Sequence, residues 1–227
     1  MTPLPSSQAR VLLLVAHPDL RRSRVNRRLL DAARRLAGAH LDGRLEVRDL
    51  YALYPDFAID VEAEQAALER ADLIVWQHPM QWYSMPALMK LWLDEVLRYG
   101  WAYGHHRRAL AGKDLWLLLS TGGSAAAFQP SGYNRRFLDA FLPPYEQTAA
   151  MCGLRLLPPL VLHDALRVDD TALAGHVHRV IERLSNYPDW PELAELAPCD
   201  ACEPPEADRP DDRTDAAVAV APPELRP

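Results

Sequence analysis

Long hydrophobic runs are absent from this 227-residue sequence. No stretch approaches the roughly 18 uninterrupted apolar residues that a transmembrane helix needs. The first ten residues, MTPLPSSQAR, also lack the basic and then apolar pattern of a secretory signal. We therefore expect a cytoplasmic protein.

Cysteine is scarce, with three residues in the chain, and an odd number does not make a disulfide framework. Cys199 and Cys202 form a Cys-x-x-Cys pair without further ligands nearby, so we interpret them as inert thiols. Cys152 borders an apolar run and is expected in the core. The histidine pairs at 105–106 and 176–178 fit a solvated loop and a helix face better than a metal site. We predict no metal centre.

The excess of acidic over basic residues lies at the end of the chain. Residues 189–227 hold 11 acidic residues, 3 arginines and 8 prolines, without apolar periodicity. This composition predicts a disordered acidic tail. We expect a flexible leader over 1–9, a single folded domain over 10–188 and the tail over 189–227.

Strand-like and helix-like patterns alternate along the domain, which favours an α/β fold with a parallel sheet. Short apolar runs predict the strands, and apolar residues at helical spacing predict the helices. The expected strands are 11–16, 45–50, 73–77, 115–119 and 154–162, with Pro158-Pro159 favouring a sheet edge or bulge in the last. The expected helices begin after Ser23 and cover 61–71, 86–99, part of 136–152 with a break at Pro143-Pro144, and 169–187.

A strand, a polar-aromatic loop and a helix follow one another in residues 72–104. The strand is expected to stop at His78-Pro79, because proline cannot donate to a ladder. In the next loop, Trp82 offers an aromatic face and Gln81 a donor and an acceptor, which suit a flat heteroaromatic ligand. The alternative is that the loop aromatics cover an edge of the core. Ligands bind at the carboxyl ends of strands in such folds, which favours a site.

The loop after the first strand could hold a phosphate. Ser23 is a plausible cap of the helix that follows, and a helix start presents free amides and a positive dipole end. His17, Ser23 and Asn26 add side-chain donors. The alternative is an ordinary capped helix with a solvated arginine face.

Ser120 and Thr121 precede Gly122-Gly123 after the fourth strand. Two glycines allow the backbone to approach a ligand closely, although a plain turn would also explain them. Three such loops, after the first, third and fourth strands, should meet at one edge of the sheet. No Gly-x-Gly-x-x-Gly follows a strand, so a separate dinucleotide domain is not expected.

The motifs WQHPMQWYSMPALMKLWLDEV (76–96) and GWAYG (100–104) resemble the flavodoxin-like NAD(P)H:quinone oxidoreductases, the group that includes DT-diaphorase. LYALYPDFAIDVEAEQ (50–65) is similar to one subgroup, the ancillary flavoproteins of glutathione-regulated potassium-efflux systems. The resemblance covers about residues 11 to 187. It implies a five-stranded parallel sheet, order 2-1-3-4-5, with helices on both faces.

The resemblance also implies a cofactor, a reaction and site residues. The cofactor would be FMN, with FAD as an alternative, and NAD(P)H would reduce quinones by two-electron, ping-pong hydride transfer in one shared pocket. The implied cofactor-binding residues are His17, Ser23, Arg24, Val25, Asn26, Pro79, Met80, Gln81, Trp82, Ser120, Thr121, Gly122 and Gly123.

The sequence departs from DT-diaphorase-like relatives at two positions. These relatives carry a tyrosine and a histidine proposed to handle protons on the reduced cofactor, and Phe128 and Asn134 stand there by spacing. Neither residue titrates, and Tyr133 is displaced by one position. A proton relay in this loop is therefore in doubt, although hydride transfer depends more on orientation.

Two further roles are left open by the resemblance. The protein could regulate a potassium-efflux antiporter at the inner face of the membrane, with turnover incidental, or act as an azo- or nitroreductase. Relatives complete their site across a two-fold dimer, so we expect a homodimer in which Trp101 and Tyr103 lie near the flavin pocket. Nucleic-acid partners are not expected.

Overall fold

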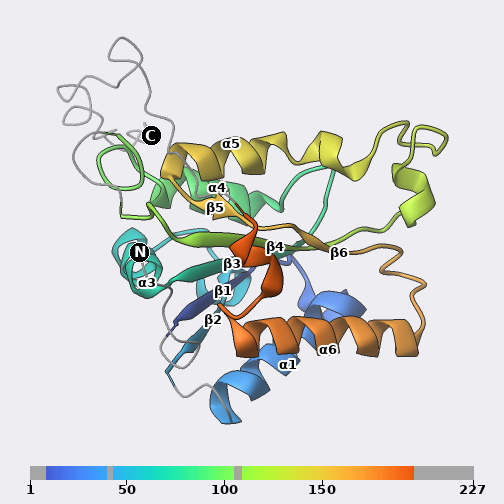
Figure 1. Cartoon of the computed structure of the whole chain (residues 1–227), viewed down its shortest axis with the longest axis horizontal. Coiled ribbons are helices and arrows are strands. Elements are labelled where there is room, and N and C mark those ends of the chain that lie inside the picture. The colour runs from blue at the N-terminus through green and yellow to red at the C-terminus, as the bar shows by residue number, and fades with distance from the viewer. Residues whose placement is uncertain (1–8, 40–42, 105–108, 197–227) are drawn as a thin grey trace, which may run out of the picture.

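The computed structural model describes residues 9–39, 43–104 and 109–196 and shows a parallel sheet between two layers of helices (Figure 1). The strand order is β2-β1-β3-β4-β5, and a short β6 also pairs with β4. This confirms the flavodoxin-like α/β class and its strand order, with one strand more than expected. The strands are β1 (Val11–Val15), β2 (Leu45–Asp49), β3 (Leu73–Pro79), β4 (Asp114–Ser120), β5 (Arg155–Leu156) and β6 (Leu160–Leu162).

Helices α1 and α6 pack on one face of the sheet, and α3, α4 and α5 pack on the other (Figure 1). Within the described residues, no helix combines the length and apolar character needed to cross a membrane. The helices are α1 (Arg24–Ala39), α2 (Leu50–Leu53), α3 (Val61–Arg70), α4 (Ala87–Val96), α5 (Pro143–Cys152) and α6 (Asp170–Asn186). The described residues also form four 3₁₀ turns: η1 (Leu20–Arg22), η2 (Ala125–Phe128), η3 (Leu138–Phe141) and η4 (Pro191–Ala194).

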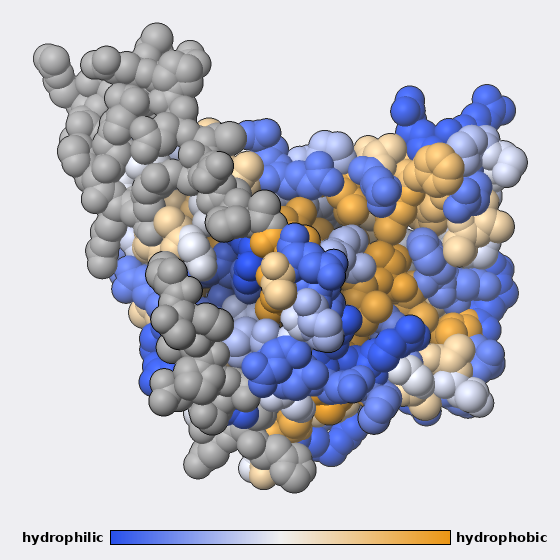
Figure 2. Space-filling view, in the orientation of Figure 1, coloured by the Kyte–Doolittle hydropathy of each residue, from blue (hydrophilic) through white to orange (hydrophobic). Residues whose placement is uncertain are grey.

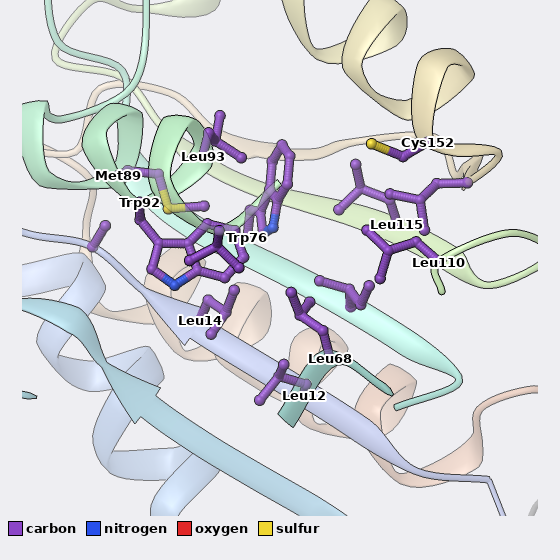
Figure 3. Close-up of a cluster of buried hydrophobic side chains, with 14 of the residues drawn as sticks. Leu12, Leu14, Leu68, Trp76, Met89, Trp92, Leu93, Leu110, Leu115 and Cys152 are labelled. Carbon is purple, nitrogen blue, oxygen red and sulfur yellow. The ribbon is translucent and has the colours of Figure 1, made fainter. Parts of the chain in front are cut away.

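The core beneath α4 is built from large side chains of the sheet and of the helices that cover it. Trp76 of β3 and Trp92 of α4 are almost fully buried and lie among leucines of β1, α3 and β4 (Figure 3). The carboxylate of Glu64, at 0% exposure, accepts hydrogen bonds from Trp92, Arg48 and Tyr54. Buried charge is tolerated where donors surround it, so this carboxylate ties α3 to β2 and α4.

Strand β3 runs two residues further than predicted and includes His78 and Pro79. The register explains why the proline is accepted. β1 ends opposite Gln77, so the last residues of β3 pair only with β4. A missing N–H therefore removes no bond to β1 there.

The predicted fifth strand is divided into β5 and β6, because Pro158 and Pro159 cannot donate to the ladder. Both pieces form the edge of the sheet, as the two prolines indicated. Figure 2 shows hydrophobic side chains at the surface between α5 and α6, over this edge. The other proline pair, Pro143-Pro144, starts α5 and does not break a helix, since proline fits the first helical turn.

Several element ends also differ from the prediction. Leu50 begins α2, because the Asp49 side chain caps this helix through the N–H of Ala52. Helix α4 begins at Ala87, with Pro86 in the cap position, and ends at Val96. Part of the loop expected between the first strand and Ser23 forms η1.

The start of the expected tail is folded onto the domain. Trp190 is only 4% exposed, packs edge-on against Trp116 with ring centroids 4.9 Å apart, and lies under the Arg183 guanidinium. Residues 191–194 form η4. The folded part therefore extends to at least residue 196. Some predictions fall outside the described residues. They concern the leader up to residue 8, His105-His106, Cys199 and Cys202.

Candidate functional site

A cavity of about 380 Å³ opens at the carboxyl end of the sheet. It collects the loops after β1, β4 and β6, together with the end of β3. Such a place is where open α/β sheets hold ligands. Its lining residues are His17, Arg22, Ser23, Arg24, Val25, Asn26, Pro79, Ser120, Thr121, Gly122, Ala165 and Leu166.

A second cavity of about 190 Å³ adjoins the first and shares Thr121 and Gly122 with it. We call the first the α1 cavity and the second the aromatic cavity. The aromatic cavity is lined by Met80, Trp82, Tyr83, Thr121, Gly122, Gly123, Phe128, Tyr133 and Asn134. The structure thus brings together every predicted cofactor-binding residue except Gln81, which lines neither cavity.

The α1 cavity ends at a capped helix start. The Ser23 hydroxyl accepts the Asn26 N–H at 3.1 Å, so Ser23 is the helix cap that the sequence predicts. Its own proton stays available to donate. The N–H groups of Arg24 and Val25 lie in the first helical turn, where the helix itself offers no acceptor. This end of the cavity suits an anion.

His17 adds a further donor to the same end. Its Nδ1 accepts the N–H of Asp19 at 3.1 Å, which leaves the proton of the neutral ring on Nε2. Partial burial lowers the pKa of His17, with nearby carboxylates opposing the shift. The ring therefore offers a neutral N–H donor near pH 7.

Asn26 and Arg24 differ from expectation. The Asn26 side chain is buried and its Nδ2 donates to the Ser120 hydroxyl at 2.9 Å, so it braces β4 rather than offering this donor to a ligand. The Arg24 guanidinium binds the Asp170 carboxylate at 2.8 Å and the Val168 carbonyl at the start of α6. Part of the guanidinium is therefore engaged at α6, whereas the backbone N–H of Arg24 has no acceptor within its own helix.

The aromatic cavity is bordered by a tight turn. Trp82 and Tyr83 both have positive φ, and the turn is closed by two hydrogen bonds between Gln81 and Ser84. Trp82 is 93% exposed. Positive φ in bulky residues is uncommon and costs of order 1 kcal/mol or more, and such strain concentrates at functional sites.

The double glycine forms the wall between the two cavities. A Cβ on Gly122 would meet no atom within 4 Å, because this residue faces the open cavity. A Cβ on Gly123 would lie 2.5 Å from the Tyr133 hydroxyl oxygen. A side chain at either position would fill the cavity or displace Tyr133. The turn therefore leaves room for a ligand close to the backbone.

Phe128 and Asn134 lie in the aromatic cavity, but neither can exchange a proton. Phe128 is 6% exposed and packs against Phe141 and His163. Asn134 Oδ1 accepts the Tyr83 hydroxyl at 3.2 Å. The hydroxyl of Tyr133, over Gly123, is a candidate proton donor in this cavity.

Sequence reasoning missed four residues that line the cavities: Arg22, Tyr83, Ala165 and Leu166. Ala165 and Leu166 reach the α1 cavity because β6, which precedes them, pairs with β4. The sequence predicts one fifth strand and does not reveal this separate pairing. Arg22 belongs to the arginine face that the alternative interpretation of the loop after the first strand leaves in solvent. The three loops that the sequence predicts at the site do not include the loop after the last strand.

Trp101, which we expected near the flavin pocket of a homodimer, is covered by its own chain. It is 9% exposed, packs in the core and donates to Glu69 at 3.0 Å. It lies in the loop that leads into β4, at the amino end of the sheet, and Tyr103 packs against the same core. Within one chain, both residues are therefore at the end of the sheet opposite the cavities.

Three solved structures resemble this chain over most of its length. A thermophilic tryptophan halogenase from Streptomycin violaceusniger is 39% identical, with a TM-score of 0.69, and the match covers 76% of this chain and 96% of that one. General stress protein 14 from Treponema denticola, solved in complex with FMN, is 37% identical with a TM-score of 0.68 over 77% and 95%. An NADPH-quinone reductase from P. pentosaceus is 29% identical with a TM-score of 0.68 over 78% and 98%.

The family model described as flavodoxin-like fold matches residues 9–184, which span β1 to most of α6. The match includes the loops that form both cavities. With the observed strand order, it shows that this chain belongs to the flavodoxin-like fold family.

Proposed function

We propose that this chain binds FMN at the carboxyl end of its sheet and acts as an NAD(P)H:quinone oxidoreductase. The observation that carries the proposal is the pair of adjoining cavities. One ends in helix-start donors suited to a phosphate, and the other is walled by aromatic side chains suited to a ring. A relative 37% identical to this chain was solved in complex with FMN.

The residues present fit this cofactor. The phosphate would lie against His17, Ser23 and the first amides of α1. The ring would lie along Thr121-Gly122-Gly123, where glycine leaves space beside the backbone. FAD carries the same ring and a longer tail, and it stays the alternative to FMN.

When bound, FMN supplies the carrier that accepts hydride from a nicotinamide and passes it to an acceptor. The chain's own residues position the partners. Trp82 and Tyr83 offer faces against which a nicotinamide or a quinone could stack. Tyr133 holds a hydroxyl over Gly123, where it could donate a proton. Since the sequence contains no separate dinucleotide motif, donor and acceptor would use this aromatic cavity in turn.

Initial rates over a grid of NAD(P)H and quinone concentrations test the function. A shared cavity predicts parallel double-reciprocal lines. Trp82→Ala should raise the KM for both substrates. Phe57→Ala is a matched control, because Phe57 is also an exposed aromatic residue with positive φ but lines neither cavity. Absence of quinone turnover by FMN-loaded protein would contradict the proposed reaction.

Relatives of similar likeness carry different activity names, a halogenase and a quinone reductase among them. The substrate therefore needs its own test. Side-by-side turnover of quinones, azo dyes and nitroaromatics separates quinone reduction from the azo- or nitroreductase alternative. A higher kcat/KM for azo dyes than for every quinone would favour that alternative.

We also propose that the protein forms a homodimer. The support is the exposure of Trp82 and Tyr133, at 93% and 73%, beside the aromatic cavity. Exposed aromatic side chains are typical of interfaces, and a two-fold pair would cover both copies at once. Sedimentation at micromolar concentration tests this. A fully active monomer would contradict it.

The regulatory role in potassium efflux is a second proposal, supported by the similarity of residues 50–65 to the ancillary flavoproteins. It places the protein in the cytoplasm, at the inner face of the membrane when an antiporter holds it. Potassium efflux measured with and without this protein tests the role, using an antiporter encoded nearby. Equal efflux in both cases would contradict it.

A further inference from the structure

The glycine turn between the two cavities is braced by the segment that follows β6. Three backbone hydrogen bonds of 2.9 to 3.0 Å join residues 121–123 to residues 162–165. His163 lies in the middle of the bracing segment and lines neither cavity. Its imidazole is therefore placed behind the turn.

His163 also contacts the turn through its side chain. Its Nδ1 lies 2.9 Å from the Thr121 hydroxyl, and that hydroxyl lies 2.7 Å from the Gly123 carbonyl oxygen. A threonine hydroxyl has one proton to donate, and a carbonyl can only accept. Thr121 therefore donates to Gly123, and both contacts are satisfied when His163 Nδ1 carries a proton and donates to Thr121.

Two residues that His163 contacts form walls of the site. Thr121 is 2% exposed and lines both cavities. The ring of Phe128, which lines the aromatic cavity, has its centroid 5.4 Å from that of His163. A shift of His163 would thus be transmitted to the glycine turn and to the ring wall together.

We propose that His163 is a positioning residue for the flavin. Its Nδ1–H fixes the Thr121 hydroxyl, which in turn holds the Gly123 carbonyl and leaves the amides of the glycine turn directed at the cofactor. This inference rests on the proposed function, because it assumes that a flavin lies along the turn. It assigns a role to a histidine whose position relative to the predicted cofactor-binding residues was not evident from the sequence.

The donor role makes a prediction about pH. Burial lowers the pKa of His163 from its ordinary value of 6.5. Both the neutral Nδ1–H form and the imidazolium keep the proton on Nδ1, so the bond to Thr121 survives acidification. Thr121 and Phe128 are uncharged, and Asp164, next to His163, forms an ion pair with Arg167 at 2.8 Å. If Nδ1 were instead an acceptor, protonation would break the bond.

The test measures FMN affinity by quenching of flavin fluorescence for four variants. His163→Leu should weaken binding about five- to tenfold, the range expected for loss of one positioned hydrogen bond. His163→Asn, whose amide can reach the place of Nδ1, should stay within about twofold of the wild type. Thr121→Val keeps the side-chain volume and removes the hydroxyl. Adding His163→Leu to Thr121→Val should then weaken binding less than about twofold further.

Controls separate positioning from stability and from the proposed function. His178→Leu, on the exposed face of α6, should leave FMN affinity unchanged. Melting of the flavin-free variants shows whether they fold. Wild-type protein that binds no flavin would contradict the proposed function itself. If wild-type protein binds FMN, three results would overturn the inference. The FMN affinity of His163→Leu could equal that of the wild type, or the effects of His163→Leu and Thr121→Val could add in the double variant. The third is an FMN affinity that falls as His163 is protonated.

Discussion

Two polar clusters at opposite ends of the sheet differ in how completely their hydrogen bonds are satisfied. At the amino end, the Asp114 carboxylate accepts two hydrogen bonds from Arg155, at 2.7 and 2.9 Å, and one from Tyr187 at 2.8 Å. At the carboxyl end, the buried oxygens Asn26 Oδ1 and Gln77 Oε1 have no partner within the described chain. Unpaired buried groups cost free energy unless a ligand or water satisfies them. The comparison indicates that one end serves stability and the other binding.

The backbone shows the same division. Every described glycine with positive φ lies in a loop that leads into a strand: Gly43, Gly100, Gly104, Gly112 and Gly153. The described non-glycine residues with positive φ lie in connections that run from a strand to the next long helix: Phe57, Trp82, Tyr83, Arg135 and Asp164. Glycine adopts this conformation without strain, whereas bulky residues do not. The chain thus accepts backbone strain at the end where side chains are needed for binding.

Asp114→Ala should produce the largest effect on stability. Removing this buried carboxylate leaves Arg155 and the Tyr187 hydroxyl without their partner, so the free energy of unfolding should fall by about 4 kcal/mol. FMN affinity should hold, because the residue lies at the opposite end from the cavities. Urea unfolding measures the change, and the exposed Asp189→Ala serves as the control. A large loss of FMN affinity in folded Asp114→Ala would break the division between the two ends.

Shortening the chain also tests the amino end of the sheet, and it should lower the free energy of unfolding somewhat less than Asp114→Ala does. A chain ending at residue 188 loses Trp190, whose Nε1 donates to the Arg183 carbonyl at 3.0 Å and whose ring covers Trp116. We expect a loss of about 3 kcal/mol, as for other large buried side chains. A chain ending at residue 196 is the control and should melt like the full chain. Equal melting of both shortened chains would show that the docked segment adds nothing.

His78→Phe should change how stability responds to acid. Full burial lowers the pKa of His78 to about 4, and its ring stacks on Tyr145. The unfolded chain binds a proton near pH 6.5 that the folded chain refuses, so stability falls as pH drops from about 6.5 to 4, by at most about 3 kcal/mol. The variant should lose less over this range. His178→Gln is the control, and parallel stability curves for wild type and His78→Phe would contradict the assignment.

Ser23→Ala should give the smallest change in stability and a selective change in binding. Loss of the helix cap should cost about 1 kcal/mol of unfolding free energy. Loss of the hydroxyl donor should weaken FMN binding about tenfold or less, while riboflavin, which lacks the phosphate, should bind nearly as before. Isothermal titration with both ligands measures this. Equal losses for the two ligands would place the phosphate elsewhere.

Asn26→Ala sharpens the contrast with Ser23. Because the Asn26 side chain braces Ser120, its loss should lower stability and weaken FMN and riboflavin alike. Paired titrations of the Ser23 and Asn26 variants reveal whether the two residues differ. A loss confined to FMN in Asn26→Ala would mean that its amide turns to the phosphate when the ligand is present.

Much of the architecture could be predicted, because apolar runs and helical spacing report burial directly. The five strands that alternate with helices, the Ser23 cap and the meeting of three loops all follow from local pattern and parallel topology. The prolines were harder. Pro79 stays in β3 because β1 has already ended at that level of the sheet. Pro143 starts a helix and does not break one. The position of each proline depends on neighbouring elements that the local sequence pattern does not reveal.

The site was predicted at the level of loops and less well at the level of atoms. The sequence predicts Asn26 as a donor to phosphate, but its side-chain amide donates to the buried Ser120 hydroxyl instead. His163 and Leu166 were missed, because their place depends on the pairing of a three-residue strand. Trp101 was expected at a pocket, but its apolar ring is covered by the core of its own chain. Such partners come from residues far apart in sequence.

The most direct measurement is the identity of whatever the purified protein carries at the carboxyl end of the sheet. Our account predicts a yellow protein that releases FMN on denaturation, identified by mass, and that rebinds FMN with one site per chain. A colourless protein that binds neither FMN nor FAD would contradict it.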